Sequence, residues 1–195
     1  MKKLLLLLIL TLLLTGCAAP ATPTDEVQTD PSQPAEDYGT QLGQKLPDFA
    51  VTTVEGENLL LSEILKEKKL VVLNFWFVDC IWCQREFPAL ELAYQRYGTD
   101  VEVLALTPYD DGETAAAFAE EHSLSFPVAT CYESFAQSFG INGYPTSVFI
   151  DREGRVSLIH SGAITDPSTF YSVFDVYTAD DYTHSTYYRI SELER

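Results

Sequence analysis

The sequence is poor in positive charge. Of its 195 residues only 12 are lysine or arginine, against 29 aspartate and glutamate, so the formal net charge is −17. Such a chain repels the phosphates of nucleic acids and of anionic lipid headgroups. We therefore expect no nucleic-acid partner and no electrostatic attachment to a membrane surface.

Histidine is also scarce, which limits the metal sites that the chain can build. The three histidines, His122, His160 and His184, stand far apart in the sequence. A structural zinc site needs four ligands, commonly two pairs of cysteine or histidine, and the chain has one cysteine pair without a second pair. We predict no metal site and no other cofactor. A copper or other metal chaperone is kept as an alternative function.

One long hydrophobic run is present, and it lies at the start of the chain. Residues 4–14 are almost all apolar, but a span across a bilayer takes about 20 such residues. With two lysines before it, the run predicts a signal peptide over residues 1–16. The closing sequence LTGC resembles the lipobox of bacterial lipoproteins, which implies that Cys17 is lipidated. An ordinary signal peptide with an incidental Cys17 is the alternative.

The signal peptide and lipobox predict an exported protein that is lipid-anchored to a bacterial membrane and faces its extracytoplasmic side. Residues 17–40 are rich in proline and acids with almost no large aliphatic side chain, so we predict a flexible tether there. Residues 41–179 remain for one globular domain, which is long enough for a single core. Residues 180–195 show no clear period and are left unassigned.

Hydrophobic periodicity predicts an α/β domain with a mixed sheet flanked by helices. A turn at residues 55–57 between two apolar runs indicates a β-hairpin. The unbroken apolar run from residue 70 is typical of a central strand that is buried on both faces. The predicted elements are a hairpin over 49–61, strands over 70–78, 101–108, 126–130, 141–151 and 156–162, and helices over 62–68, 83–97, 112–122, 132–140 and 166–177, with Ser62 and Asp166 as N-caps.

The pair Cys80-Ile81-Trp82-Cys83 lies where the central strand gives way to a helix. At a helix start, unpaired backbone N–H groups and the helix dipole stabilise a thiolate. We predict that Cys80 is the attacking thiol and that Cys83 resolves the mixed disulfide. A structural disulfide is the alternative, although a loop of two intervening residues constrains the unfolded chain very little.

Several stretches of the chain, between about residues 42 and 178, resemble one family. These are "LNFWFVDCIWCQREFPALELAYQRYG", "FPVAT" and "GINGYPTSVFID" followed by "REG". They resemble the membrane-anchored thioredoxin-fold proteins of the TlpA/ResA type, which are related to the redoxin and AhpC/TSA proteins. The resemblance implies a thioredoxin fold with an N-terminal hairpin and an inserted strand-helix unit. It also implies thiol–disulfide oxidoreductase activity on protein substrates and a membrane redox donor.

The same resemblance assigns roles to residues around the pair. Pro145 is expected to be a cis-proline that faces the disulfide, with its neighbouring backbone pairing with the substrate chain. Glu86 is expected to assist proton transfer, and a solvated helix residue without such a role is the alternative. Apart from the resemblance, we take Tyr144, next to Pro145, and Trp82, between the cysteines, as further candidates for substrate binding.

The chain departs from the family pattern at two positions. Asp79 replaces the tryptophan before the first cysteine, and Trp82 replaces the proline before the second. An acid beside Cys80 opposes its thiolate while the helix dipole favours it, so Asp79 is a candidate for redox tuning and the direction of electron flow stays open.

Two further hypotheses concern Cys131 and the domain as a whole. Cys131 follows the strand over residues 126–130 and is either a third redox partner or, as lone cysteines more often are, a small buried apolar residue. The domain as a whole could also be a non-catalytic binding module that holds a partner at its cis-proline groove.

Overall fold

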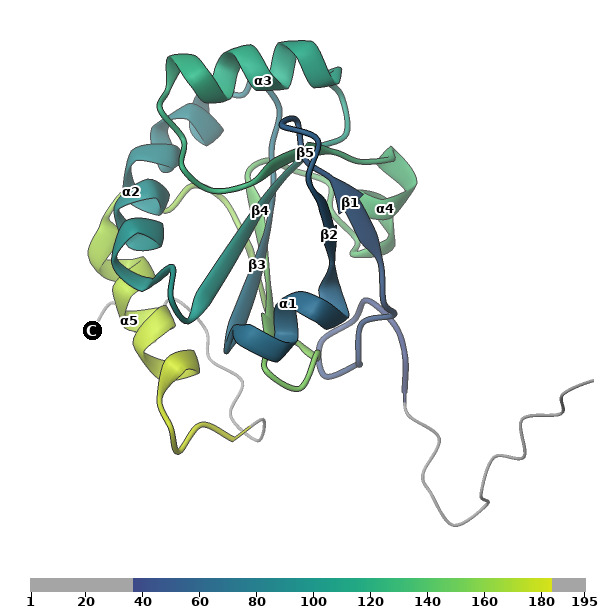
Figure 1. Ribbon diagram of the computed structural model, residues 1–195, viewed down its shortest axis with the longest axis vertical. Coiled ribbons are helices and arrows are strands. Elements are labelled where there is room, and N and C mark those ends of the chain that lie inside the picture. The colour runs from purple at the N-terminus through teal and green to yellow at the C-terminus, as the bar shows by residue number, and fades with distance from the viewer. Residues whose placement is uncertain (1–36, 184–195) are drawn as a thin grey trace, which may run out of the picture. The chain divides into compact units, whose positions relative to one another are not determined.

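A five-stranded mixed sheet forms the centre of the computed structural model, which describes residues 37–183 (Figure 1). The strand order is β5-β4-β3-β6-β7. The pairs β3–β4 and β4–β5 are parallel, whereas β3–β6 and β6–β7 are antiparallel. The strands are β3 (Leu70–Phe75), β4 (Val101–Thr107), β5 (Val128–Thr130), β6 (Thr146–Asp151) and β7 (Val156–Ser161).

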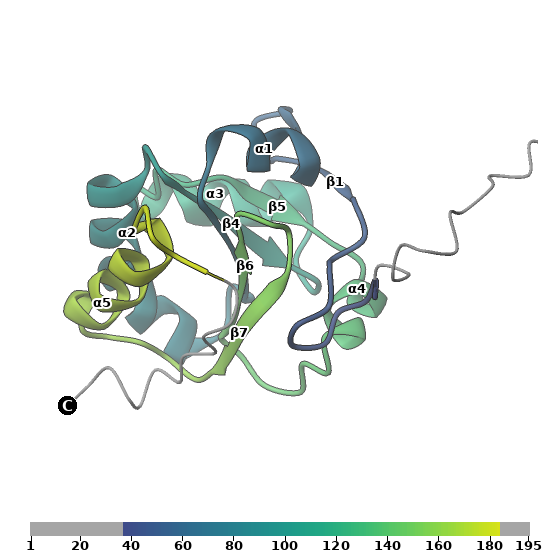
Figure 2. The same ribbon diagram turned by 90° about the horizontal axis from the view of Figure 1, so that it is seen from below.

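Five helices connect or cover these strands. They are α1 (Leu61–Glu67), α2 (Ile81–Tyr97), α3 (Gly112–Glu121), α4 (Glu133–Ser138) and α5 (Pro167–Thr178). Helices α2 and α5 lie side by side on one face of the sheet, and α4 lies on the other (Figure 2). Between the halves β3-α2-β4 and β6-β7-α5 stands the segment α3-β5-α4, which contains the inserted strand-helix unit expected from the sequence.

The central strand β3 is fully buried because helices cover both faces of the sheet. Successive side chains of a strand point to opposite faces. Val72, and Trp76 just beyond the strand, join the cluster that α2, α3 and α5 complete. Leu73 and Phe75 join the cluster on the side of α1 and α4. The unbroken apolar run in the sequence therefore did predict a strand that is buried on both faces.

The predicted hairpin is confirmed by the pairing of β1 (Ala50–Thr52) with β2 (Asn58–Leu60). The prediction that Ser62 caps the next helix was wrong. Helix α1 begins one residue earlier, at Leu61, and its N-cap position makes no side-chain hydrogen bond. Ser62 instead donates its backbone N–H and its hydroxyl to the carboxylate of Asp48, at 3.0 and 2.7 Å. Asp48, which precedes the hairpin, thus accepts a backbone N–H of the first turn of α1.

The bounds of some elements differ from those predicted from the sequence. Strand β3 ends at Phe75. The Trp76 N–H still donates to the carbonyl of Leu106 in β4, but the Val78 N–H donates to the side chain of Asp110 and no longer to a strand. Strand β5 begins only after Pro127, which has no N–H to donate to a ladder. Helix α5 starts as predicted, with the carboxylate of Asp166 accepting from the Ser168 N–H.

The first described residues belong to the end of the predicted tether. Asp37 accepts the backbone N–H of Lys45 at 3.0 Å and a side-chain N–H of Gln44 at 3.0 Å. The predictions for residues 1–36, including the signal peptide, and for residues 184–195 lie outside the described residues. Within residues 37–183 no helix is both long enough and apolar enough to cross a bilayer.

Candidate active site

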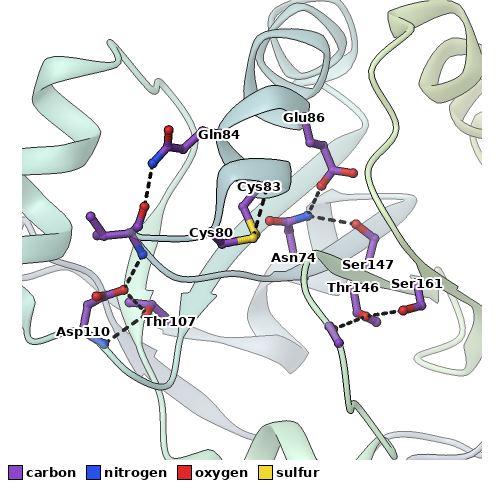
Figure 3. Close-up of a disulfide and its surroundings, with 12 residues drawn as sticks. Asn74, Cys80, Cys83, Gln84, Glu86, Thr107, Asp110, Thr146, Ser147 and Ser161 are labelled. Carbon is purple, nitrogen blue, oxygen red and sulfur yellow. Dashed lines mark hydrogen bonds between the residues drawn. A yellow bond between two sulfur atoms is a disulfide. The ribbon is translucent and has the colours of Figure 1, made fainter.

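The two cysteines form a disulfide at the start of α2. Cys80 is the N-cap residue of this helix, and the backbone N–H of Cys83 donates to the Cys80 Sγ at 3.1 Å (Figure 3). Cys80 is 6% exposed and Cys83 is fully buried. The sulfur nearer to solvent is therefore also the one that receives a helix N-terminal N–H, which favours its thiolate once the disulfide is reduced.

The loop that leads to Cys80 is held by side chains that bind both backbone groups of one residue, Val78. The backbone N–H of Val78 donates to the carboxylate of Asp110 at 2.9 Å, and its carbonyl accepts from the side-chain amide of Gln84 at 2.7 Å. Asp110 is held in turn by the hydroxyl of Thr107, at 2.6 Å (Figure 3). Strand β4 and helix α2 therefore fix the conformation of the chain two residues before the nucleophile.

Pro145 lies at the same end of the sheet as the disulfide. The Tyr144–Pro145 peptide bond is cis, which is the geometry that the resemblance implies. In the β3–β6 pairing Thr146 stands opposite Phe75, so Pro145 lies beside the loop that follows β3. The hydroxyl of Thr146 donates to the carbonyl of Gly143 at 2.8 Å and thereby fixes the turn before β6 (Figure 3).

Glu86 is fully buried on α2, one helical turn after Cys83. Its carboxylate accepts the side-chain N–H of Asn74 at 2.7 Å and the backbone N–H of Ile164 at 2.7 Å. Burial raises the pKa of Glu86 from 4.5 to about 7, against the opposing effect of these two hydrogen bonds. The carboxyl group can therefore gain or lose a proton near neutral pH.

Asn74 is a site residue that the sequence analysis missed. It is the single polar residue of β3, and its side-chain N–H also donates to the hydroxyl of Ser147 at 3.0 Å. Among the described residues its Oδ1 has no hydrogen-bond partner although it is buried. A buried amide inside an otherwise apolar run was the signal in the sequence. Asp110 and Gln84 were missed as well, and nothing in their local sequence marks them.

The other predicted site residues lie at or near the surface. Trp82 is 54% exposed, and the guanidinium of Arg85 lies 4.6 Å from the centre of its ring. Asp79 is exposed beside Cys80 and makes no hydrogen bond or ion pair within the described chain. The role of Asp79 in redox tuning stays a prediction.

Cys131 is a free thiol that is half-buried between the end of β5 and α4. Burial raises its pKa to about 12, which keeps it in the unreactive thiol form near neutral pH. No group of three or more histidine, cysteine or acidic side chains is arranged to hold a metal ion in the part of the chain that the structure describes. Cys17 lies outside that part.

The fold and the disulfide agree with what sequence comparison finds. Residues 42–159 match the sequence profile of the AhpC/TSA family. The chain belongs to the AhpC/TSA family. One relative of this AhpC/TSA protein is the thioredoxin-like protein YneN of Bacillus subtilis (strain 168), which is 34% identical over 133 residues, or 67% of this chain and 77% of YneN.

A second relative is the thiol-disulfide oxidoreductase ResA of Halalkalibacterium halodurans. It is 32% identical over 128 residues, which are 65% of this chain and 72% of ResA. Among solved structures, a thiol:disulfide interchange protein of the thioredoxin family from Chlorobium tepidum TLS matches with a TM-score of 0.60 at 22% identity, covering 69% of this chain and 96% of that one. The AhpC/TSA protein described here therefore has the thioredoxin fold that the sequence predicted.

Replacing Glu86 tests whether the pKa of its carboxyl group is raised in the folded protein. Between pH about 4.5 and about 7 the folded protein keeps a proton on Glu86 that the unfolded chain has lost, so stability falls as the pH rises through this window. Between pH about 5 and about 8, we expect the free energy of unfolding of the oxidised wild type to fall on the order of 3 kcal/mol more than that of Glu86→Gln. Denaturant unfolding at the two pH values measures the difference.

The control for this experiment is Glu120→Gln, which removes an exposed carboxylate of α3. Its stability should follow the wild type across the window. Parallel pH profiles for the wild type and Glu86→Gln would contradict the assignment of a raised pKa to Glu86.

Replacing Asp110 separates positioning of the Cys80 loop from charge. Asp110→Ala leaves the Val78 N–H and the Thr107 hydroxyl without their acceptor, which should cost about 1–3 kcal/mol of stability. Asp110→Asn keeps an acceptor oxygen but removes a negative charge near Cys80. This favours the Cys80 thiolate, so we expect Asp110→Asn to keep most of the stability and to shift the reduction potential toward a more oxidising value.

Denaturant unfolding and equilibration with glutathione redox buffers give the two quantities. Equal reduction potentials in the wild type and Asp110→Asn would show that the Asp110 charge does not reach the sulfur.

Proposed function

We propose that the protein is an extracytoplasmic thiol–disulfide oxidoreductase that exchanges its Cys80–Cys83 dithiol and disulfide with protein substrates. The observation that carries the proposal is the disulfide itself, closed across the first turn of α2 with its outer sulfur hydrogen-bonded to a helix N–H. Two relatives, YneN and ResA, bear names that fit the same chemistry.

The exchange proceeds through a mixed disulfide. The Cys80 thiolate attacks one sulfur of a substrate disulfide, forms a new S–S bond and releases the other substrate sulfur as a thiolate, which takes up a proton. The Cys83 thiolate then attacks the Cys80 sulfur, closes the internal disulfide and releases the substrate as a dithiol. Two electrons pass to the substrate, and a dithiol donor at the membrane restores the Cys80–Cys83 dithiol.

Glu86 is placed to handle the proton of the buried thiol. It lies three residues after Cys83 on the same helix, so the two side chains share one face of α2. Cys83 must lose its proton before it attacks, and both residues are closed to solvent. We assign Glu86 as the group that accepts this proton, which its raised pKa makes possible near neutral pH.

We also propose that the protein is lipid-anchored through Cys17 on the outer side of a bacterial membrane. The apolar run over residues 4–14 and the LTGC sequence support this location. An oxidising compartment also suits a protein whose active pair must cycle through a disulfide.

Serine substitutions test the exchange mechanism. In Cys83→Ser the mixed disulfide cannot be resolved, so we expect the variant to accumulate covalent adducts with substrate proteins that reductant releases. Cys80→Ser should form none, and Cys131→Ser should reduce a test protein disulfide like the wild type. Absence of adducts in Cys83→Ser, together with no reduction of the test disulfide by the wild type, would favour the binding-module alternative.

Replacing Cys17 tests the anchor. Expressed in a bacterium, the wild type should be found in the membrane fraction and incorporate labelled palmitate. Cys17→Ala should do neither, while Cys131→Ala keeps both properties. Equal palmitate labelling of Cys17→Ala and the wild type would show that Cys17 is not the modified residue.

A further inference from the structure

The disulfide lies at one end of the sheet, and the chain segments that surround it can be identified from the topology. Strands β3, β4, β5 and β7 all finish at this end and β6 begins there, because β6 runs antiparallel to β3 and β7. The segments at the same end of the sheet as Cys80 and Cys83 therefore include residues 76–80, 108–111, 131–132, 140–145 and 162–166.

Three aromatic rings from three of these segments form one cluster. Phe77 precedes Cys80, Tyr109 follows β4, and Tyr144 precedes the cis-proline. The ring centres of Phe77 and Tyr144 are 5.4 Å apart, those of Phe77 and Tyr109 5.8 Å, and those of Tyr109 and Tyr144 5.6 Å, all in edge-to-face orientation. Tyr109 is 54% exposed, so the cluster offers an aromatic face to solvent beside the loop that carries Cys80.

A second exposed aromatic group lies between the cysteines. Trp82 is 54% exposed, and Arg85 stacks over its ring. An indole ring that is half open to water beside a reactive sulfur loses apolar hydration when a substrate side chain covers it. Trp82 belongs to neither of the buried clusters, so the packing of the domain does not account for an indole ring at this position.

The charge of these segments is of one sign. Every charged residue within them is acidic, namely Asp79, Asp110, Asp111 and Asp166. The backbone N–H and hydroxyl bonds that Asp110 accepts do not neutralise its charge. Asp79, next to the attacking sulfur, is exposed and has no cationic partner in the described chain. Arg85, over the ring of Trp82, is a cation beside these segments. The four carboxylates outweigh it, so the net negative field at this end of the sheet attracts a positively charged segment.

We propose that the protein selects substrates whose reactive cysteine stands in a segment with an aromatic side chain and basic residues beside it. The Phe77–Tyr109–Tyr144 cluster and Trp82 receive the aromatic side chain, and the acidic segments attract the basic residues. This inference rests on the proposed thiol–disulfide exchange and names the class of polypeptide on which that exchange acts.

Four small probes test the preference in the reduced full-length protein. Three are short peptides with one cysteine joined by a disulfide to the chromophore 2-nitro-5-thiobenzoate. The first has a phenylalanine and two lysines beside the cysteine, the second has glutamates in place of the lysines, and the third has alanine in place of the phenylalanine. The fourth probe joins the same chromophore to 2-mercaptoethanol and gives the rate without a peptide. Attack by Cys80 releases the coloured thiolate in every case.

We expect the lysine peptide to react at least about tenfold faster than the glutamate peptide at low ionic strength, with a ratio that shrinks as salt is added. We expect phenylalanine to give about threefold to tenfold over alanine, which is the range of one aromatic contact. Each rate is divided by that of the 2-mercaptoethanol probe for the same variant, so changes in the reactivity of Cys80 cancel.

Variants then locate the preference. Tyr109→Ala and Trp82→Ala should each lower the normalised phenylalanine-over-alanine ratio, and Asp79→Asn should lower the lysine-over-glutamate ratio. Tyr38→Ala is the matched control, because Tyr38 is also 54% exposed but lies at the other end of the sheet. Tyr38 pairs with Lys45, and Lys45 pairs with Arg155 in the turn between β6 and β7. It should leave both ratios unchanged.

The outcomes separate this inference from the function on which it rests. Equal normalised rates for all three peptides, with rapid reaction of each, would overturn the proposed selectivity and leave the exchange activity in place. Ratios that fall equally in Tyr38→Ala and Tyr109→Ala would also overturn it. No reaction with any of the four probes would instead contradict the proposed function.

Discussion

The buried hydrogen bond between Asn74 and Glu86 joins the parts on which the site depends. Asn74 belongs to the central strand and Glu86 to the helix that carries both cysteines. Glu86 also binds the backbone of Ile164 after β7, and Asn74 binds Ser147 of β6. One polar group of four residues therefore fixes α2 against the central strand and the antiparallel side of the sheet. An unpaired carboxylate in this place would be costly, so each partner is necessary to the others.

The same polar group can adapt to the protonation state of Glu86. With Glu86 ionised, the side-chain N–H of Asn74 donates to it, and the Asn74 Oδ1 remains without a partner in the described chain. With Glu86 protonated, a half-turn of the Asn74 amide would let Oδ1 accept both the new O–H and the hydroxyl of Ser147, since a hydroxyl can donate as well as accept. Asn74 thus carries a donor for the ionised carboxylate and, once turned, an acceptor for the protonated one.

The sequence predicted the elements and the chemistry whose signals are local. The apolar run before the pair, the glycine after α2 and the Asp166-Pro167 helix start each act through neighbouring residues, and each element is present in the structure. The missed features depend on residues distant in sequence. Asp110 reaches Val78 across 32 positions, Asp48 displaces the predicted capping role of Ser62, and Ile164 reaches Glu86 across 78. Such partners are set by strand order, which no local pattern contains.

The direction of electron flow depends on opposing contributions at the Cys80 sulfur. The N–H of Cys83 and the α2 dipole stabilise its thiolate and so make the pair more oxidising. The carboxylates of Asp79 and Asp110 act against the thiolate and make the pair more reducing. Asp79 is exposed and screened by solvent, whereas Asp110 is held against the loop by Thr107 and Val78. The fixed and less solvated charge exerts the stronger field, so Asp110 has more influence on the potential than the substituted residue next to the cysteine.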